Sequence, residues 1–262
     1  MMAEHQIRFN DGAAYERMMG TWSQLAGATF LDWLAAPARM RWLDVGCGNG
    51  AFTQMIVDRC APTAVDGLDP SEGQLVFARA RPAASLAQFH AGTAMALPFA
   101  DKSFDAAVMA LVIFFVPDPA KGVAEMTRVV RPGGSISAYA WDVMRGGFPL
   151  EALQDEMLAL GHKPSLPPSA AASRMEVMRS LWSDAGIQNI ETKEITVQRT
   201  FADFDDFWTT SQGSNAGSQI AAMPAGDVEI LKSRLRARLP SDSIGRITYG
   251  ACANAIKGRL PV

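Results

Sequence analysis

Short apolar runs alternate along this chain of 262 residues with segments in which apolar side chains recur at helical spacing. Residues 13–34 carry the helical period, which predicts one or two helices before the first strand. From Arg41 the pattern predicts strands over 42–45, 63–68, 86–90, 104–112 and 135–141. Helical segments begin between several of these runs, near Ala51, Ser71 and Ala120. Strands that alternate with helices indicate a parallel sheet covered on both faces.

The alternation stops after Trp141. A stretch over 145–172 is rich in Gly, Pro and Ala, and we interpret it as an insertion with a short helix near 150–160. Further helices are predicted over 175–185 and 227–239, and strands over 190–201 and 244–256, which are placed to pair as an antiparallel edge. We therefore expect a helical cap over 1–38 and one α/β domain over 39–262, with insertions at about 145–172 and 202–243.

The charge balance favours a small-molecule partner. The chain has 24 basic and 27 acidic residues and a net charge of −3, so no general attraction to nucleic acid or to an anionic membrane is expected. The longest uncharged apolar run, 106–116, is shorter than the roughly 20 residues that span a bilayer. The first residues carry no basic segment followed by an apolar one, so we expect no secretory signal.

The three cysteines, Cys47, Cys60 and Cys252, form no CxxC pair and are too scattered for a disulfide framework. We therefore expect no metal site and a cytoplasmic location. The oligomeric state cannot be inferred from these features.

A glycine-rich loop carries the sharpest chemical signal. Gly46, Gly48 and Gly50 follow the first predicted strand and open a helix. Glycines permit positive φ and remove Cβ atoms, so a ligand can lie against bare backbone at a helix N-terminus, where free N–H groups are available. Asp69 ends the second strand, 19 positions after Gly50, where an acidic residue can accept from the ribose hydroxyls of a nucleoside cofactor. An alternative role for Asp69 is to cap the helix that follows.

Two cofactor classes remain open from the loop itself. Gly46, Gly48 and Ala51 satisfy the dinucleotide pattern G-x-G-x-x-G/A, which would indicate NAD. The additional Gly50, the acidic Asp44 and the preceding forty residues of helical pattern argue against that assignment.

Four ordered motifs carry a family resemblance: Asp44-x-Gly46-x-Gly48-x-Gly50, then 67–71, 92–105 and 128–134. Together they resemble the class I S-adenosylmethionine-dependent methyltransferases, and most closely the branch that includes quinone-biosynthesis C-methyltransferases and many small-molecule methyltransferases. The resemblance implies a Rossmann-like, mostly parallel sheet of seven strands with an antiparallel last strand. S-adenosyl-L-methionine would lie across the C-terminal ends of the first, second and fourth strands.

The resemblance also implies roles for individual residues. Gly46 and Gly48 would contact the methionine part of the cofactor, Asp44 would lie near its amino group, and Asp69 would hold the ribose. The remaining expected cofactor-binding residues are Tyr15, Gly50, Pro70, Gln74, Thr93, Ala94 and Leu111. Relatives commonly have an acid in place of Thr93, which weakens the expected recognition of adenine.

No catalytic base can be named. Some relatives have a histidine where this chain has Phe114 and Phe115, and His162 in the insertion is a poor substitute. Candidates to line an acceptor pocket are aromatic: Tyr15, Trp22, Phe114, Phe115, Trp141, Phe148, Trp182, Phe207 and Trp208. Tyr15 and Trp141 are favoured because they neighbour the strand ends that carry the motifs.

The sequence predicts a methyltransferase that acts on a small molecule by direct in-line transfer. The alternatives are a non-catalytic S-adenosylmethionine or S-adenosylhomocysteine-binding protein of the same fold and an NAD-dependent oxidoreductase.

Overall fold

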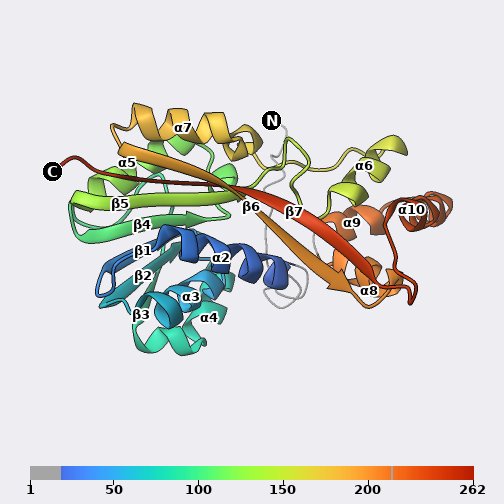
Figure 1. Cartoon of the computed structure of the whole chain (residues 1–262), viewed down its shortest axis with the longest axis horizontal. Coiled ribbons are helices and arrows are strands. Elements are labelled where there is room, and N and C mark those ends of the chain that lie inside the picture. The colour runs from blue at the N-terminus through green and yellow to red at the C-terminus, as the bar shows by residue number, and fades with distance from the viewer. Residues whose placement is uncertain (1–18, 214) are drawn as a thin grey trace.

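A single seven-stranded sheet organises the chain (Figure 1). The computed structural model describes residues 19–213 and 215–262. The strands lie in the order β3-β2-β1-β4-β5-β7-β6. β1 to β5 are mutually parallel, and β7 is antiparallel to both of its neighbours. The strand bounds are β1 Arg41–Val45, β2 Ala64–Asp69, β3 Ala87–Ala91, β4 Phe104–Ala110, β5 Val130–Trp141, β6 Gln188–Phe201 and β7 Ile247–Arg259. The predicted sheet, including its antiparallel last strand, is confirmed.

Helices cover both faces of this sheet, whose central strands β1, β2 and β4 are mostly buried. On one face lie α2, α3 and α4, and on the other α5 and α7 (Figure 1). Tyr139 of β5 packs on the first face against Phe30 of α2 and Phe52 of α3, with ring centroids 4.6 and 5.7 Å away. The bounds are α2 Thr21–Leu34, α3 Ala51–Cys60, α4 Glu72–Arg79, α5 Pro119–Val129, α6 Glu151–Ala159, α7 Met175–Asp184, α8 Phe204–Ser211, α9 Asn215–Ala221 and α10 Ala225–Arg238.

β5 begins at Val130, whereas the sequence predicted that this strand starts at residue 135. Phe104 of β4 pairs with Val130, yet Ala106 pairs with Ser135, so residues 131–134 bulge out of the ladder. The turn residues of that segment concealed the first part of the strand, since Pro and Gly usually end one. The expected loop therefore lies inside β5.

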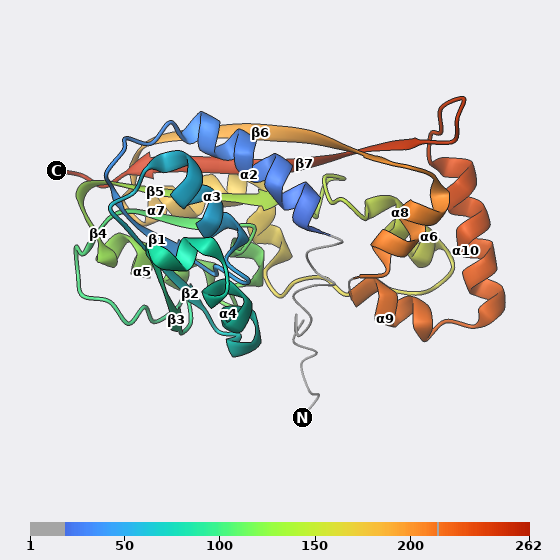
Figure 2. The same cartoon turned by 90° about the horizontal axis from the view of Figure 1, so that it is seen from below.

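A second group of helices extends beyond the sheet. β6 and β7 remain paired as far as Phe201 and Ile247, and both run past the other strands. Figure 2 shows α6, α8, α9 and α10 gathered at the far end of this ribbon; we call these four helices the helical lobe. Leu231 and Leu235 bury the inner side of α10, and Arg238 pairs with Asp155 of α6 at 2.6 Å. The sequence pattern gave no counterpart for α9.

Within the described ranges, no helix has the length and apolar character needed to cross a membrane. Over the same residues, no three His, Cys, Asp or Glu side chains come together to hold a metal ion. All three cysteines are free thiols.

Candidate cofactor site

The glycine loop is fixed to the end of β2. The backbone N–H groups of Gly46 and Cys47 both donate to the carbonyl of Leu68, at 2.7 and 3.0 Å. The N–H of Gly50 then donates to Cys47 O at 2.9 Å, and Gly50 is the N-cap of α3. The loop therefore closes as a tight turn whose last residue starts a helix, as predicted.

The three glycines have different structural reasons to be glycine. All have positive φ, of +78° at Gly46, +51° at Gly48 and +77° at Gly50. A Cβ on Gly46 would lie 2.5 Å from Cγ1 of Val112, and one on Gly50 would lie 3.0 Å from Cβ of Ala78. A Cβ on Gly48 would have no atom within 4 Å. The first and third glycines are needed for packing, whereas Gly48 faces open space with bare backbone.

Asp69 joins this loop to the end of β2. Its Oδ2 accepts from the N–H of Gly48 at 2.9 Å, and its Oδ1 accepts from the N–H of Ser71 at 2.8 Å. Burial raises the pKa of Asp69, and these two backbone hydrogen bonds oppose that rise. The N-cap of α4 is Ser71, whose hydroxyl accepts from Gln74 N. The capping alternative for Asp69 is therefore wrong, and its carboxylate lies directly beside Gly48.

Asp44 is fully buried at the base of the same loop. Its Oδ2 accepts from the hydroxyl of Thr53 at 2.6 Å, while its Oδ1 has no hydrogen-bond partner among the described residues. Burial raises the pKa of Asp44 to about 7, with a smaller upward contribution from the charge of Asp69, and the bond from Thr53 acts in the opposite direction. Two carboxylates within one loop system favour a ligand that carries positive charge.

The other predicted cofactor residues lie along the same edge of the sheet. The N–H of Gly92 donates to Asp69 O at 3.1 Å, which brings the segment of Thr93 and Ala94 beside the end of β2. Pro70 and Thr93 are exposed, whereas Gln74 is only 5% exposed. Leu111 follows β4 with a φ of +61°, an unusual conformation for a bulky residue. Tyr15 lies outside the described residues.

Several residues that shape the site were not predicted. Thr53 holds Asp44 from α3, and Val112 packs on Gly46 from the turn after β4. Arg128 of α5 donates to the carbonyls of Leu97 and Phe99, at 2.9 and 2.8 Å. Of these three residues, only Arg128 lies in a motif that the sequence analysis singled out, residues 128–134. That motif did not indicate which groups Arg128 contacts.

The aromatic acceptor candidates separate into two groups. Trp182 lies on the α7 face, where its indole donates to Ile136 O at 3.2 Å, so it is structural. Trp22, Trp141 and Phe114 are buried near the end of β5 and the turn after β4, while Phe207 packs in the helical lobe. His162 pairs with Asp227 of α10 at 2.9 Å, away from the glycine loop. A small hollow at the opposite ends of the strands, lined by Met40 and Arg259, contains none of the predicted site residues.

Comparisons with known proteins agree with this geometry. A family model described as a methyltransferase domain matches residues 43–138. A demethylmenaquinone methyltransferase of Renibacterium salmoninarum is 32% identical over 191 residues, which cover 65% of this chain and 78% of that protein. An uncharacterized protein of Mycobacterium tuberculosis is 33% identical over 159 residues, 58% of this chain. The chain spans about half the length of this relative, 55%.

Solved structures share the fold. The YcgJ protein of Bacillus subtilis has a TM-score of 0.61 at 16% identity, with 90% of this chain and 98% of that chain covered. Phosphoethanolamine N-methyltransferase 2 of Haemonchus contortus, in complex with phosphomonomethylethanolamine and S-adenosylhomocysteine, has a TM-score of 0.59 at 17% identity. That match covers 95% of this chain and 56% of the other.

The chain belongs to the class I S-adenosylmethionine-dependent methyltransferases. The cofactor of this family is S-adenosyl-L-methionine, which decides against the NAD alternative. The residues present fit it: open backbone at Gly48, a carboxylate at Asp69, and the unpartnered oxygen of Asp44 match a nucleoside that carries a sulfonium and an ammonium group.

Proposed function

We propose that this chain transfers a methyl group from S-adenosyl-L-methionine to a small-molecule acceptor by direct in-line displacement. The observation that carries the proposal is the arrangement of Gly48 and Asp69. The N–H of Gly48 is tied to the Asp69 carboxylate at 2.9 Å, and the side of Gly48 that would hold a Cβ is open. This arrangement leaves backbone and a charged acceptor available to one ligand.

The bound cofactor supplies a methyl group on a positively charged sulfur, whose C–S bond breaks toward sulfur as the acceptor atom bonds to carbon. Gly46, Gly48 and Asp44 would hold the methionine part, and Asp69 would accept hydrogen bonds from the ribose. Thr93, Ala94 and Gln74 would lie near the adenine. Gly48 has a positive φ, which glycine adopts readily. Because Gly48 has no side chain, the loop backbone can lie close to the ligand.

Alignment accounts for much of the expected rate. Holding donor carbon and acceptor atom in line can lower the barrier by about 7–11 kcal/mol, so the reaction does not require a general base in the site. A proton lost by the acceptor would pass to solvent. The helical lobe and the residues around Trp141 would exclude water from the acceptor and orient it.

Binding and turnover test the proposal in order. Calorimetry with S-adenosylmethionine, S-adenosylhomocysteine and NAD should show binding of the first two compounds only. Asp69→Ala should weaken that binding by about tenfold to a hundredfold, because charge-assisted hydrogen bonds contribute about 1.5–3 kcal/mol each. Asp58→Ala, which removes a carboxylate bonded to Gln54 on the exposed side of α3, is the matched control.

Acceptors should then be screened for formation of S-adenosylhomocysteine. A demethylated naphthoquinol belongs in the panel, since one relative is named for demethylmenaquinone. Cofactor binding without turnover of any acceptor would instead support the non-catalytic binding protein. Tight binding of NAD alone would refute the proposal.

A further inference from the structure

Trp141 ends β5 with a buried hydrogen-bond donor that has no acceptor. The side chain is 1% exposed, and its Nε1 has no partner among the described residues. A buried donor without an acceptor is unfavourable, because its hydrogen bond to water is lost on folding and is not replaced. Of two other buried indoles, that of Trp182 donates to the carbonyl of Ile136, whereas that of Trp42, inside β1, is also unpaired in the described part of the chain. Trp141 differs from Trp42 in its position, because it is the last residue of its strand, at the sheet edge where the predicted site residues lie.

The position of Trp141 connects it to the cofactor loop. β5 pairs with β4, and β4 pairs with β1, so one strand separates Trp141 from the strand that carries Asp44. Asp44 of β1 is level with Ser137 of β5 through Val108, so Trp141 lies four residues, about 13 Å, farther along its strand. The turn after β4 lies between them, with Leu111 N bonded to Tyr139 O and Val112 packed on Gly46. The turn after β4 therefore connects the end of β5 to the glycine loop.

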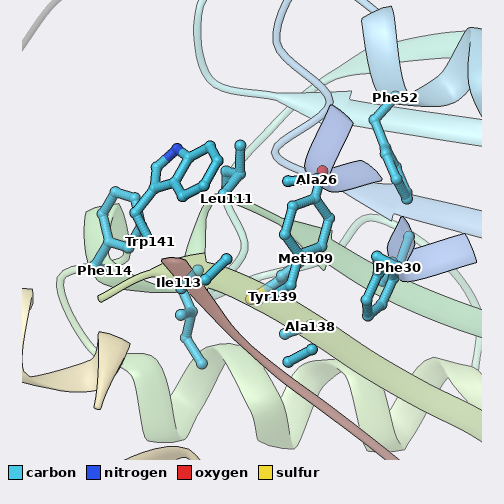
Figure 3. Close-up of a cluster of buried hydrophobic side chains, with 14 of the residues drawn as sticks. Ala26, Phe30, Phe52, Met109, Leu111, Ile113, Phe114, Ala138, Tyr139 and Trp141 are labelled. Carbon is cyan, nitrogen blue, oxygen red and sulfur yellow. The ribbon is translucent and has the colours of Figure 1, made fainter. Parts of the chain in front are cut away.

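The surroundings of the indole are apolar. Figure 3 shows Trp141 between Leu111 and Phe114, with its nitrogen on the ring edge that points away from Phe114 and from β5. Leu111 and Phe114 are 8% and 3% exposed. Trp22 of α2 meets the indole edge to face, with ring centroids 6.5 Å apart. One donor within aromatic and aliphatic walls selects a flat apolar molecule that presents an oxygen acceptor.

We infer that the indole N–H of Trp141 anchors the methyl acceptor by donating to its oxygen, and that the acceptor is a flat, apolar, uncharged molecule with a hydroxyl or carbonyl group. This inference rests on the proposed methyl transfer. The carboxylates of Asp44 and Asp69 disfavour an anionic acceptor nearby. The oxygen that binds Trp141 need not be the atom that receives the methyl group.

Access to the N–H requires movement of α2. Trp22 lies in the first turn of that helix and is 1% exposed. Gly20, which precedes the helix, has helical dihedral angles, φ −54° and ψ −50°, and residues 19 and 20 form a π-helical turn. Displacement of Trp22 from the indole would open the donor to the acceptor.

Nuclear magnetic resonance of the indole protons tests the inference on the intact chain. The chain has six tryptophans, so the indole N–H region is simple, and Trp141→Phe and Trp42→Phe identify two of its resonances. Trp42 is the matched control, because its Nε1 is also buried and unpartnered but lies within β1. In protein saturated with S-adenosylhomocysteine, added 2-naphthol should move the Trp141 indole proton downfield and leave that of Trp42 in place. Naphthalene should move neither proton downfield.

Affinity gives a second readout. Trp141→Phe keeps the ring and should weaken 2-naphthol binding by about threefold to tenfold, the effect of losing one hydrogen bond between neutral groups. Binding of naphthalene and of S-adenosylhomocysteine should be unchanged. The substitution removes a donor that has no partner in the described part of the folded chain, so Tm should not fall. Trp42→Phe should change none of these affinities.

The outcomes separate this inference from the proposed function. If the unmodified chain did not bind S-adenosylhomocysteine, both the proposed methyl transfer and the role of Trp141 would be refuted. Normal cofactor binding would overturn the anchor alone if 2-naphthol failed to bind, if it bound without moving the Trp141 proton, or if Trp141→Phe bound it equally well.

Discussion

The hydroxyl of Thr53 donates a 2.6 Å hydrogen bond to one oxygen of the buried Asp44, and the other oxygen has no partner among the described residues. This half-satisfied carboxyl group lies beneath the glycine loop. Its pKa of about 7 means that the folded chain holds a proton which the unfolded chain, with a pKa near 3.8, releases. Stability should therefore fall as pH rises between these two values.

Replacing this acid with its uncharged isostere should stabilise the ligand-free chain at high pH. At pH 8, Asp44→Asn removes a buried charge and should raise Tm by roughly 2–8 °C, which corresponds to about 1–2 kcal/mol in a chain of this size. The gain should shrink toward pH 5, where the native acid is protonated. Thermal unfolding across this pH range checks the expectation.

A buried acid with full pairing is the control for that variant. Asp66 accepts from Arg41 at 3.1 Å and lies 2.8 Å from His90 Nε2, so Asp66→Asn should lower stability at pH 8. A gain for Asp44→Asn that did not depend on pH would show that its charge is not the cause.

Cofactor binding should release a proton through the same group. Positive charge near Asp44 favours its ionised form, so affinity for S-adenosylmethionine should rise about tenfold from pH 6 to pH 8 as the carboxyl of pKa about 7 ionises. Calorimetry at pH 6.5 in buffers of different ionisation enthalpy measures the released proton directly. The release should disappear in Asp44→Asn, and an equal release in that variant would assign the proton to another group.

The glycines of the loop should separate stability from binding. Gly48→Ala meets no neighbouring atom and should cost about 1–2 kcal/mol of backbone strain, while it obstructs the cofactor. Gly46→Ala adds a clash with Val112 at 2.5 Å and should destabilise the chain more. Denaturant unfolding and cofactor titration measure the two effects.

A double substitution tests the cause of the Gly46 effect. Val112→Ala removes both Cγ atoms that a Cβ at Gly46 would meet, so it should partly restore the stability of Gly46→Ala. The same substitution should do nothing for Gly48→Ala. Equal rescue of both variants would exclude contact with Val112 as the reason.

Arg128 should hold the segment after Ala94 in place. Besides its bonds to Leu97 O and Phe99 O, its guanidinium donates to both oxygens of Glu125, at 2.8 Å each. Arg128→Lys keeps the charge but cannot make the same set of hydrogen bonds. We therefore expect the free energy of unfolding to fall by about 2–3 kcal/mol and proteolysis near residues 97–101 to become faster. Arg131→Lys, at an exposed pair with Asp105, should cost under about 1 kcal/mol.

Local patterns predicted the elements that depend on local chemistry. Three alternate glycines indicated positive φ, and all three have it. The paired strands β6 and β7 were visible from their alternation. The bulge at 131–134 was not, because the pairing of Val130 with Phe104 overrides the turn residues that follow it.

The candidate site was predictable as a set of strand ends but not as a set of contacts. Thr53 occupies a helix, where a polar residue usually indicates the solvent-facing side, and its bond to Asp44 appears only once α3 lies on β1. The unpaired N–H of Trp141 has no sequence signal, because every indole has the same donor and only the fold decides whether it finds an acceptor. The roles expected for the cofactor-binding residues, Tyr15 included, remain predictions.

The ribbon of β6 and β7 carries three of the four helices of the helical lobe, α8, α9 and α10, as one insertion. Both strands stay in register up to Phe201 and Ile247, so residues 202–246 occupy the place of an ordinary hairpin turn. Exchange of that segment for another helical insert, or for a short turn, would leave the order and register of the sheet intact. Under the proposed function, such exchange would give evolution, and protein engineering, a way to change the acceptor while the glycine loop stays as it is.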